Sequence, residues 1–249
     1  MAVLVKSLNG LTYSSIKTRD GLAAASIARI DGLDVTSASF IPTDIAGCVY
    51  WGQAESLGLA NNDPATTFTD LSGNGNDLVS TGTDPVFKTG ILNGKAALRF
   101  SGVNVMRKSF FLAQPVTVFI VSANAVLATP ATPFDGASNL TANLYCADGE
   151  INLYSGGFGS ANATGVTWAN PNVIGAIFNS SSSQIFLNGS YTATSLSGSS
   201  DLDGINLGSW GNGFQNPWTG DILEVIVYNS ALSTSELRPW TYLQTEYGL

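Results

Sequence analysis

The chain has 249 residues, of which 44% are hydrophobic and 11% are charged, a balance that is typical of a folded protein. Its net charge of -8 has the wrong sign for nucleic-acid binding, so no nucleic-acid partner is expected. Because the sequence contains no histidine, it excludes Ser-His-Asp and Cys-His catalytic sites and His-ligated metal sites.

The first 39 residues contain a repeat with a period of 11. The triplets Asn9-Gly10-Leu11, Asp20-Gly21-Leu22 and Asp31-Gly32-Leu33 recur in phase. Asn-Gly and Asp-Gly favour tight turns, so each unit is predicted to be a short extended piece followed by a turn. Residues 1–39 are too few to form their own core. We predict an extended docking arm that binds a capsid or tail protein, and the alternative is an N-terminal cap on the same domain.

Residues 40–249 are predicted to form the second domain, an all-β, two-sheet antiparallel β-sandwich of the jelly-roll kind. Short runs of β-branched and aromatic residues alternate with Gly, Asn, Asp and Ser clusters, as in such folds. Asn188-Gly189 predicts a two-residue hairpin. The clearest predicted strands are Ala96–Phe100, Val116–Ser122, Asn143–Cys146, Ile151–Tyr154, Val173–Phe178, Gln184–Leu187 and Asp221–Tyr228.

A short C-terminal helix is the exception to this pattern. Ser233 and Glu236 have the spacing of a capping box, and apolar residues then recur at helical intervals up to Tyr247. Pro239 lacks an N–H, so the helix is predicted either to begin after Ser233 or to bend at the proline. In the preceding segment, Ile222–Tyr228, both faces of the predicted strand are mostly apolar, which places it inside the sandwich.

Several segments resemble the laminin G-like branch of the concanavalin A-like lectin/glucanase superfamily. They are Val49-Tyr50-Trp51, residues 70–77, residues 94–102, residues 220–229 and residues 231–249. The resemblance covers residues 44–249 and implies a β-sandwich jelly roll. It also implies a carbohydrate- or protein-binding role, and many such modules occur in secreted and phage virion proteins. One fold carries many kinds of site, so the resemblance specifies the fold better than the function.

The acidic residues do not match a glycoside hydrolase. Retaining glucanases of this superfamily carry Glu-x-Asp-x-x-Glu on one strand, and the sequence lacks that string. Asp201 and Asp203 are two positions apart, but the neighbouring Gly and Ser residues predict a loop there. We therefore expect a non-enzymatic protein.

A sugar-binding loop is predicted between Trp210 and Trp218, because sugars stack on aromatic rings and hydrogen-bond to amide side chains. Trp168 and Tyr154 are further candidates, and Trp51 is assigned to the core. In the alternative interpretation, Trp210 and Trp218 cap the core and the polar residues only make turns. The predicted ligand-binding residues are Trp210, Asn212, Gln215, Asn216, Trp218, Trp168 and Tyr154.

No cofactor and no metal site is predicted, although one turn was weighed as a calcium site. Its oxygen-bearing residues are Asp70, Asn74, Asn76 and Asp77. The same residues are those that a tight turn requires, and Gln53 stands where many members of the family carry Asp. Calcium is therefore the less favoured interpretation. Cys48 and Cys146 do not form a CxxC pair and are expected to be buried free thiols, with a disulfide as the alternative.

Two functional hypotheses follow. In the first, the protein is a virion surface component, a capsid decoration or tail-associated protein, whose arm anchors it while the lectin-like domain contacts glycans. In the second, it is an adhesin or carbohydrate-binding module on a bacterial cell surface. No apolar run is long enough for a membrane span, and export through Sec is not expected.

Overall fold

The computed structural model describes residues 40–126, 130–138, 141–147, 149–157, 163–188, 190–193, 198–211, 215–233, 236 and 238–249, and the backbone of six short strands before residue 40. The chain divides into two compact units, Met1–Phe40 and Ile41–Leu249. Within the described residues, no helix has the length and apolarity that crossing a membrane requires.

The first unit contains three two-stranded hairpins of the same design. Their strands are β1 (Ser7–Leu8) with β2 (Leu11–Thr12), β3 (Thr18–Arg19) with β4 (Leu22–Ala23), and β5 (Arg29–Ile30) with β6 (Leu33–Asp34). Leu8 pairs with Leu11, Arg19 with Leu22, and Ile30 with Leu33, always directly across the Asn-Gly or Asp-Gly positions. The predicted extended pieces are confirmed on both sides of these positions, and the predicted turn residues lie outside the described residues.

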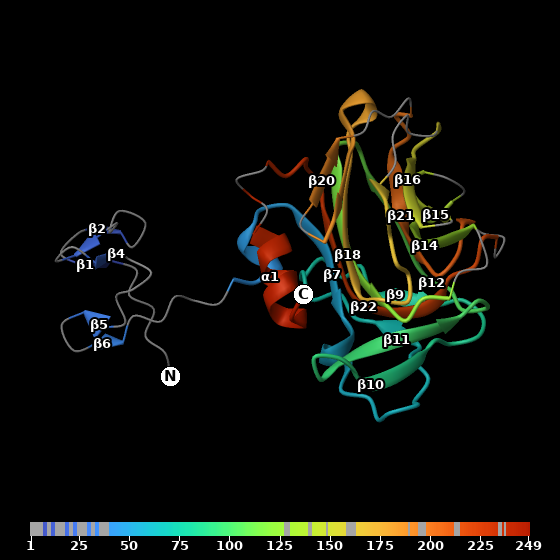
Figure 1. Ribbon diagram of the computed structural model, residues 1–249, viewed down its shortest axis with the longest axis horizontal. Helices are drawn as coiled ribbons and strands as arrows, with labels where there is room; N and C mark the ends of the chain where they lie inside the picture. Colours follow the sequence, from blue (N-terminus) through green and yellow to red (C-terminus); the bar gives the residue numbers. More distant parts are fainter. Residues whose placement is uncertain are drawn as a thin grey trace. The chain divides into compact units, whose positions relative to one another are not determined.

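The second unit is a sandwich of two antiparallel sheets (Figure 1), as predicted. The first sheet has the order β10-β11-β22-β13-β18-β19-β20, and β7 also pairs with β22. Its strands are β7 (Cys48–Gln53), β10 (Val86–Leu92), β11 (Lys95–Ser101), β13 (Val116–Ala123), β18 (Asn172–Phe178), β19 (Gln184–Leu187), β20 (Ser190–Ala193) and β22 (Thr219–Tyr228).

The second sheet has the order β17-β16-β15-β14-β21-β12-β9-β8. Its strands are β8 (Thr67–Phe68), β9 (Leu78–Ser80), β12 (Met106–Leu112), β14 (Ala131–Asp135), β15 (Asn143–Ala147), β16 (Glu150–Tyr154), β17 (Ala163–Thr164) and β21 (Leu202–Leu207). The described residues of this unit also include the 3-10 turns η3 (Pro42–Asp44), η4 (Ala54–Leu57) and η5 (Ser180–Ser182). All seven predicted strands are present, with ends that differ by at most two residues, and Leu187 pairs with Ser190 across the predicted hairpin turn.

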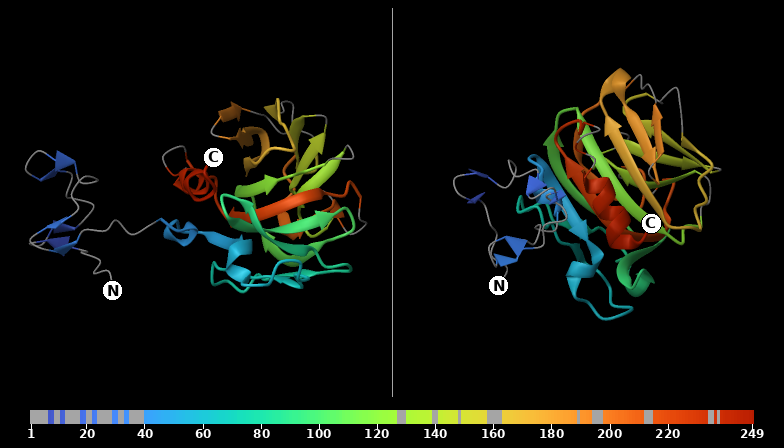
Figure 2. Two further views of the ribbon diagram at one scale, coloured as in Figure 1. Left: turned by 60° about the horizontal axis from the view of Figure 1, so that its bottom comes forward. Right: turned by 60° about the vertical axis from the view of Figure 1, so that its left-hand side comes forward.

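The core lies between the sheets, where apolar residues such as Val118 and Val225 of the first sheet face Phe134 and Leu207 of the second. β13 and β18 are buried along their whole length. Both of their faces are covered, because one faces the second sheet and the other faces the helix α1 (Arg238–Tyr247), as both views of Figure 2 show. On this outer face the Phe119 ring lies 6.4 Å from the Trp240 ring.

The helix begins later than Ser233, which is one of the two predicted outcomes. Ser233 O accepts a hydrogen bond from Glu236 N at 2.8 Å, but the α-helix starts only at Arg238. Pro239 then lies in the first turn of the helix, where backbone N–H groups have no acceptor within the helix, so a proline costs no hydrogen bond there.

The assignment of Trp51 to the core is wrong. Side chains alternate between the two faces along β7, and Tyr50 is the residue that enters the core, fully buried, with its hydroxyl donating to Phe68 O at 3.3 Å. Trp51 is half-buried on the opposite face. Cys48 and Cys146 are both buried and free, which confirms the expected thiols.

Candidate functional site

Four loops meet at one end of the sandwich, and we call the described part of them the loop end: residues 101–105, 124–126, 130–132, 165–171, 208–211 and 215–219. Gly102 N donates to Trp218 O at 3.1 Å, Ala125 N to Trp168 O at 3.0 Å and Val126 N to Thr219 O at 3.0 Å. Thr132 N also donates to Asn216 O at 2.8 Å. These contacts bring together most of the residues that the sequence singled out, from segments far apart in the chain.

Trp218 lies in the core beneath the loop end, so its prediction as a ligand-stacking residue is wrong. Its side chain is fully buried, and its ring packs edge to face on the ring of Trp168 at 5.8 Å. Its backbone is also held, because Trp218 N donates to Gly208 O at 2.8 Å. The ring therefore supports the loops from below and does not face a ligand.

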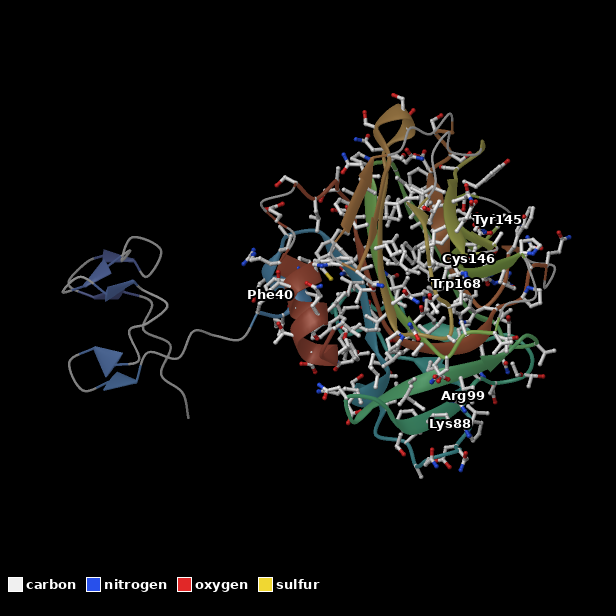
Figure 3. The ribbon with its side chains drawn as sticks, viewed as in Figure 1. Phe40, Lys88, Arg99, Tyr145, Cys146 and Trp168 are labelled. Carbon is white, nitrogen blue, oxygen red and sulfur yellow. The ribbon has the colours of Figure 1, made fainter. Side chains whose placement is uncertain are left out.

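The other predicted residues of the loop end stay candidates. Trp168 (labelled in Figure 3) and Trp210 are half-buried, Asn216 is half-buried and Gln215 is exposed. Trp210 N donates to Gln215 O at 2.8 Å, and this backbone bond joins the two ends of the segment between them. Asn212 lies outside the described residues. Val126, whose side chain is 72% exposed, adds an apolar surface to the same end.

Tyr154 is not brought to the loop end. It pairs with Asn143 on the outer face of the second sheet and is half-buried. The next residue, Ser155, donates its hydroxyl to Ser200 O at 2.7 Å, near the opposite end of β21 from the loop that follows Leu207.

A buried polar row on the outer face of the second sheet was missed by the sequence analysis. Asp135 pairs with Asn206, and both side chains are fully buried. Gly211 N donates to Asp135 Oδ2 at 3.1 Å, and Asn206 Nδ2 donates to Ser209 O at 2.7 Å. These bonds fasten the loop after β21 to the sheet. A sequence signal existed, since Asp135 directly follows Phe134 and Asn206 stands between Ile205 and Leu207.

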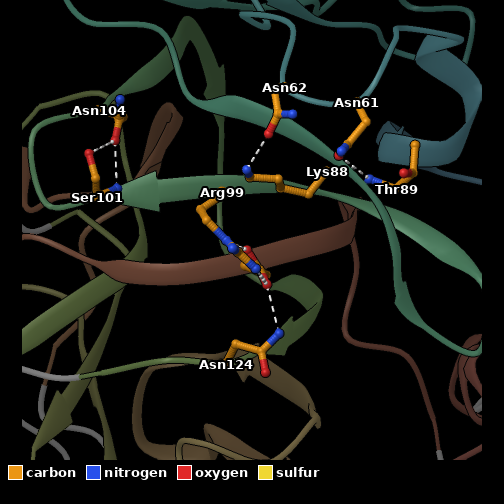
Figure 4. A network of polar contacts seen from close by, with 9 residues as sticks. Asn61, Asn62, Lys88, Thr89, Arg99, Ser101, Asn104 and Asn124 are labelled. Atoms are coloured by element: carbon orange, nitrogen blue, oxygen red, sulfur yellow. Dashed lines mark hydrogen bonds and ion pairs between the residues drawn. The ribbon is translucent and has the colours of Figure 1, made fainter.

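A polar network on the first sheet borders the loop end (Figure 4). The Arg99 guanidinium makes two 2.7 Å contacts with Asp221, from Nε to Oδ1 and from Nη2 to Oδ2. Asn124 Nδ2 donates to the same Oδ2 at 2.8 Å. The Asp221 side chain is fully buried, whereas that of Arg99 is 42% exposed. Arg99 thus covers a buried carboxylate with an oriented ion pair.

The acidic pair at 201 and 203 holds loops together. Asp201 Oδ1 accepts from Gln114 N at 2.9 Å, and Asp203 Oδ1 accepts from Thr141 Oγ1 at 2.8 Å. Burial alone would raise the pKa of Asp203, but hydrogen bonds from Ser138 and Thr141 outweigh it and hold the pKa below its usual value. The prediction that both lie in a loop is wrong for Asp203, which lies within β21. A carboxyl group with a lowered pKa is a poor general acid.

A second pair at the same spacing, Asp148 and Glu150, is also present in the sequence. β15 ends at Ala147, and Glu150 is the first residue of β16. Asp148 lies outside the described residues.

Glu224 is a buried carboxylate beneath α1. Its Oε1 accepts from Trp51 Nε1 at 2.8 Å, and its Oε2 accepts from Tyr247 Oη at 2.7 Å and from Gln53 Nε2 at 3.2 Å. Tyr242 completes the cluster, since its hydroxyl accepts from Gln53 Nε2 at 3.3 Å. Burial raises the pKa of Glu224 to about 7, against the effect of these donors. The cluster fastens α1 to the sheet and is closed to a ligand.

The Asp70 turn uses its own oxygen atoms. Asp70 Oδ1 accepts from Trp51 N at 3.1 Å and from Ser72 N at 2.9 Å, and its Oδ2 accepts from Asn76 N at 2.9 Å. Asp77 Oδ1 accepts from Asp70 N at 2.7 Å. The carboxylates therefore stabilise the turn, and among the described residues no group of three or more His, Cys, Asp or Glu side chains is arranged to hold a metal ion.

No protein-family model matches the chain, and no curated protein matches it. Solved structures match its fold. Domain 4 of AbnA, a GH43 extracellular arabinanase from Geobacillus stearothermophilus in complex with arabinotriose, is 16% identical with a TM-score of 0.57, over 78% of this chain and 97% of that one. The binding domain of Paraclostridial Mosquitocidal Protein 1 is 15% identical with a TM-score of 0.55, over 80% of this chain and 52% of that one.

Trypanosoma rangeli sialidase in complex with sialic acid is 12% identical with a TM-score of 0.52. That match covers 89% of this chain and only 36% of the sialidase, so the chain spans about a third of that enzyme. At these identities the likeness establishes the fold, a jelly-roll β-sandwich.

Proposed function

We propose that the second unit is a non-catalytic, laminin G-like carbohydrate-binding domain whose ligand binds at the loop end. The observation that carries the proposal is that the loops bearing half-buried Trp168 and Trp210 and the amide residues Gln215 and Asn216 meet at one end of the sandwich. Sugars bind to such surfaces by stacking their apolar faces on rings and by hydrogen-bonding their hydroxyl groups to amides.

The arabinanase domain supports this proposal, because it is matched over almost its whole length and is described with a bound arabinotriose. The acidic residues support the non-catalytic part. Asp201 and Asp203 are committed to loop contacts, and Glu224 is enclosed beneath α1. Two carboxyl groups facing one glycosidic bond, as hydrolysis requires, are not among these arrangements.

A glycan array probed with the full chain tests the proposal. We expect the wild-type protein to bind at least one class of glycan, and Trp210→Ala to lose that binding. Phe111→Ala is the matched control, because Phe111 is 70% exposed and lies at the far end of β12 from the loop end. Equal binding by Trp210→Ala and Phe111→Ala would contradict a site at the loop end.

A second candidate function is display of this domain on a virion surface, with residues 1–39 binding a capsid or tail protein. The three hairpins share one register and belong to a separate unit. This favours a docking role, since such short hairpins bury little apolar surface on their own. Location on a bacterial cell surface is the alternative. Mass spectrometry of purified particles and of cell envelopes distinguishes the two, because the chain should be enriched in only one of them.

A further inference from the structure

The loop end carries no ionisable side chain of its own. The segments 101–105, 124–132, 165–171 and 208–219 contain no Lys, Arg, Asp or Glu, and the whole chain contains no His. In a protein with a net charge of -8, the described residues of these four loops form an uncharged surface built from amide, hydroxyl, aromatic and aliphatic side chains.

Two arginines border the loop end: Arg107 on β12, whose Nη1 donates to Ala137 O at 3.5 Å, and Arg99 on β11, which is neutralised in place. Arg99 is held at two atoms by Asp221, and Asn124 completes the hydrogen bonding of that carboxylate. Lys88 lies one strand further out, on β10, where its ammonium group donates to Asn62 Oδ1 at 2.5 Å (Figure 4). On the side of the first sheet, an anion at the loop end would therefore meet an ion pair with no net charge.

A further neighbour of the loop end is acidic. Val166 N donates to Gly149 O at 2.9 Å, so the turn between β15 and β16 adjoins residues 165–171. Glu150 begins β16 at this turn and pairs with Thr164. The carboxylate of Glu150 carries a charge of the same sign as that of a sialic or uronic acid.

We propose that the loop end selects neutral glycans and rejects glycans that carry a carboxylate. This inference rests on the proposed function. An ionised sugar loses part of its hydration on binding and needs a cation to compensate, which the four loops do not supply. A neutral sugar needs only hydrogen bonds and an apolar platform, and the loops supply both. Of the similar structures, one holds arabinotriose and one holds sialic acid, so they do not distinguish neutral from anionic ligands. The inference rests on the charges of this chain.

Calorimetric titration of the full chain with two matched sets of oligosaccharides tests the inference. The neutral set includes arabinotriose, and the anionic set includes sialyllactose and a trigalacturonate. We expect the best neutral ligand to bind at least about tenfold more tightly than any anionic one, a difference of about 1.4 kcal/mol. We also expect its affinity to change little between 0.05 and about 1 M NaCl, since no ion pair is screened.

The outcomes that overturn the inference are distinct from those that overturn the proposed function. Tighter binding of an anionic ligand, or an affinity that falls about tenfold or more with salt, would overturn the selectivity while leaving glycan binding intact. Absence of binding to both sets would overturn the proposed function and the selectivity together.

A substitution at the exposed Gln215 offers a gain-of-function test. Gln215→Lys places a cation at the rim, and we expect it to increase the affinity for the anionic set at least about fivefold, in a salt-dependent way. Gln215→Glu is the matched control and should bind anionic ligands no better than the wild type. If wild-type binding of anionic ligands already exceeds that of Gln215→Lys, the uncharged loop end does not determine selectivity.

Discussion

The hydroxyl group of Tyr247 donates to Glu224 Oε2 at 2.7 Å, and this bond ties the last turn of α1 to the centre of the first sheet. Trp51 and Gln53 donate to the same carboxylate from β7. A carboxylate buried among donors, with its pKa raised to about 7, links the stability of the fold to pH.

Stability should fall as the pH rises from about 4.5 to about 7. In that window the folded protein retains a proton on Glu224 that the unfolded chain has released, because the folded-state pKa is raised from 4.5 to about 7. Ionisation of Glu224 should lower the free energy of unfolding by on the order of 3 kcal/mol, and this decrease should be complete above about pH 7. Urea unfolding at pH 5 and pH 8 measures it.

Glu224→Gln should flatten the pH dependence between pH 5 and 8. Glu236→Gln is the matched control, because Glu236 is exposed and precedes α1, and it should keep the wild-type slope. An unchanged slope in Glu224→Gln would show that another group is responsible. Asp203 does not confuse the result, since its lowered pKa affects stability only as the pH falls through the acidic range.

The two tryptophans of the loop after β21 should differ in their effect on stability. Trp218→Ala should cost about 3–5 kcal/mol, because it removes a fully buried ring that supports Trp168. Trp210→Ala should cost less than about 1.5 kcal/mol, since its ring is half-buried. Thermal or urea unfolding of both variants measures the difference, and equal costs would refute the distinct positions of the two rings.

Asp70 should stabilise its turn without calcium. Asp70→Ala leaves three backbone N–H groups without their acceptor and should cost about 2–3 kcal/mol. Asp63→Ala is the comparison and should cost less, because the Asp63 side chain accepts a single, exposed hydrogen bond, from Ala60 N. The wild-type melting temperature should be the same in calcium and in EDTA. A rise of several degrees in calcium would establish a metal site that the turn geometry does not provide for.

Removal of residues 1–40 should leave the second unit folded. The division of the chain at Phe40 and the complete sandwich in residues 41–249 are the reasons. The truncated chain should melt within a few degrees of the full chain by circular dichroism. Aggregation or a large loss of melting temperature would mean that the hairpins belong to the sandwich.

Most of the fold could be predicted because it depends on local patterns. β-Branched and aromatic runs such as Val116–Ala123, the turn residue Asn188 and the spacing of the Asn-Gly and Asp-Gly repeats each specify an element by themselves. The start of α1 was ambiguous because Ser233 and Pro239 give conflicting signals, and the proline decides where the α-helix begins.

The candidate site was less predictable because it depends on which way side chains face. The sequence between 210 and 218 shows two Trp and several amides but not that Trp218 turns inward onto Trp168. For the same reason Trp51 was assigned to the core. Strand alternation requires that Tyr50 and Trp51 face opposite sides of the sheet but does not say which of them enters the core. The Glu224 cluster was missed because its donors come from β7 and α1, far apart in the sequence.

The measurement that tests the central claim most directly is calorimetric titration of the full chain, wild type and Trp210→Ala, with neutral oligosaccharides. The account predicts saturable binding by the wild type; a Kd near 1 mM corresponds to about 4 kcal/mol. Loss of one stacking ring, worth about 1 kcal/mol, should weaken that binding severalfold while the variant stays folded. Absence of saturable binding by the wild type, or equal affinity in the folded Trp210→Ala protein, would contradict a glycan site at the loop end.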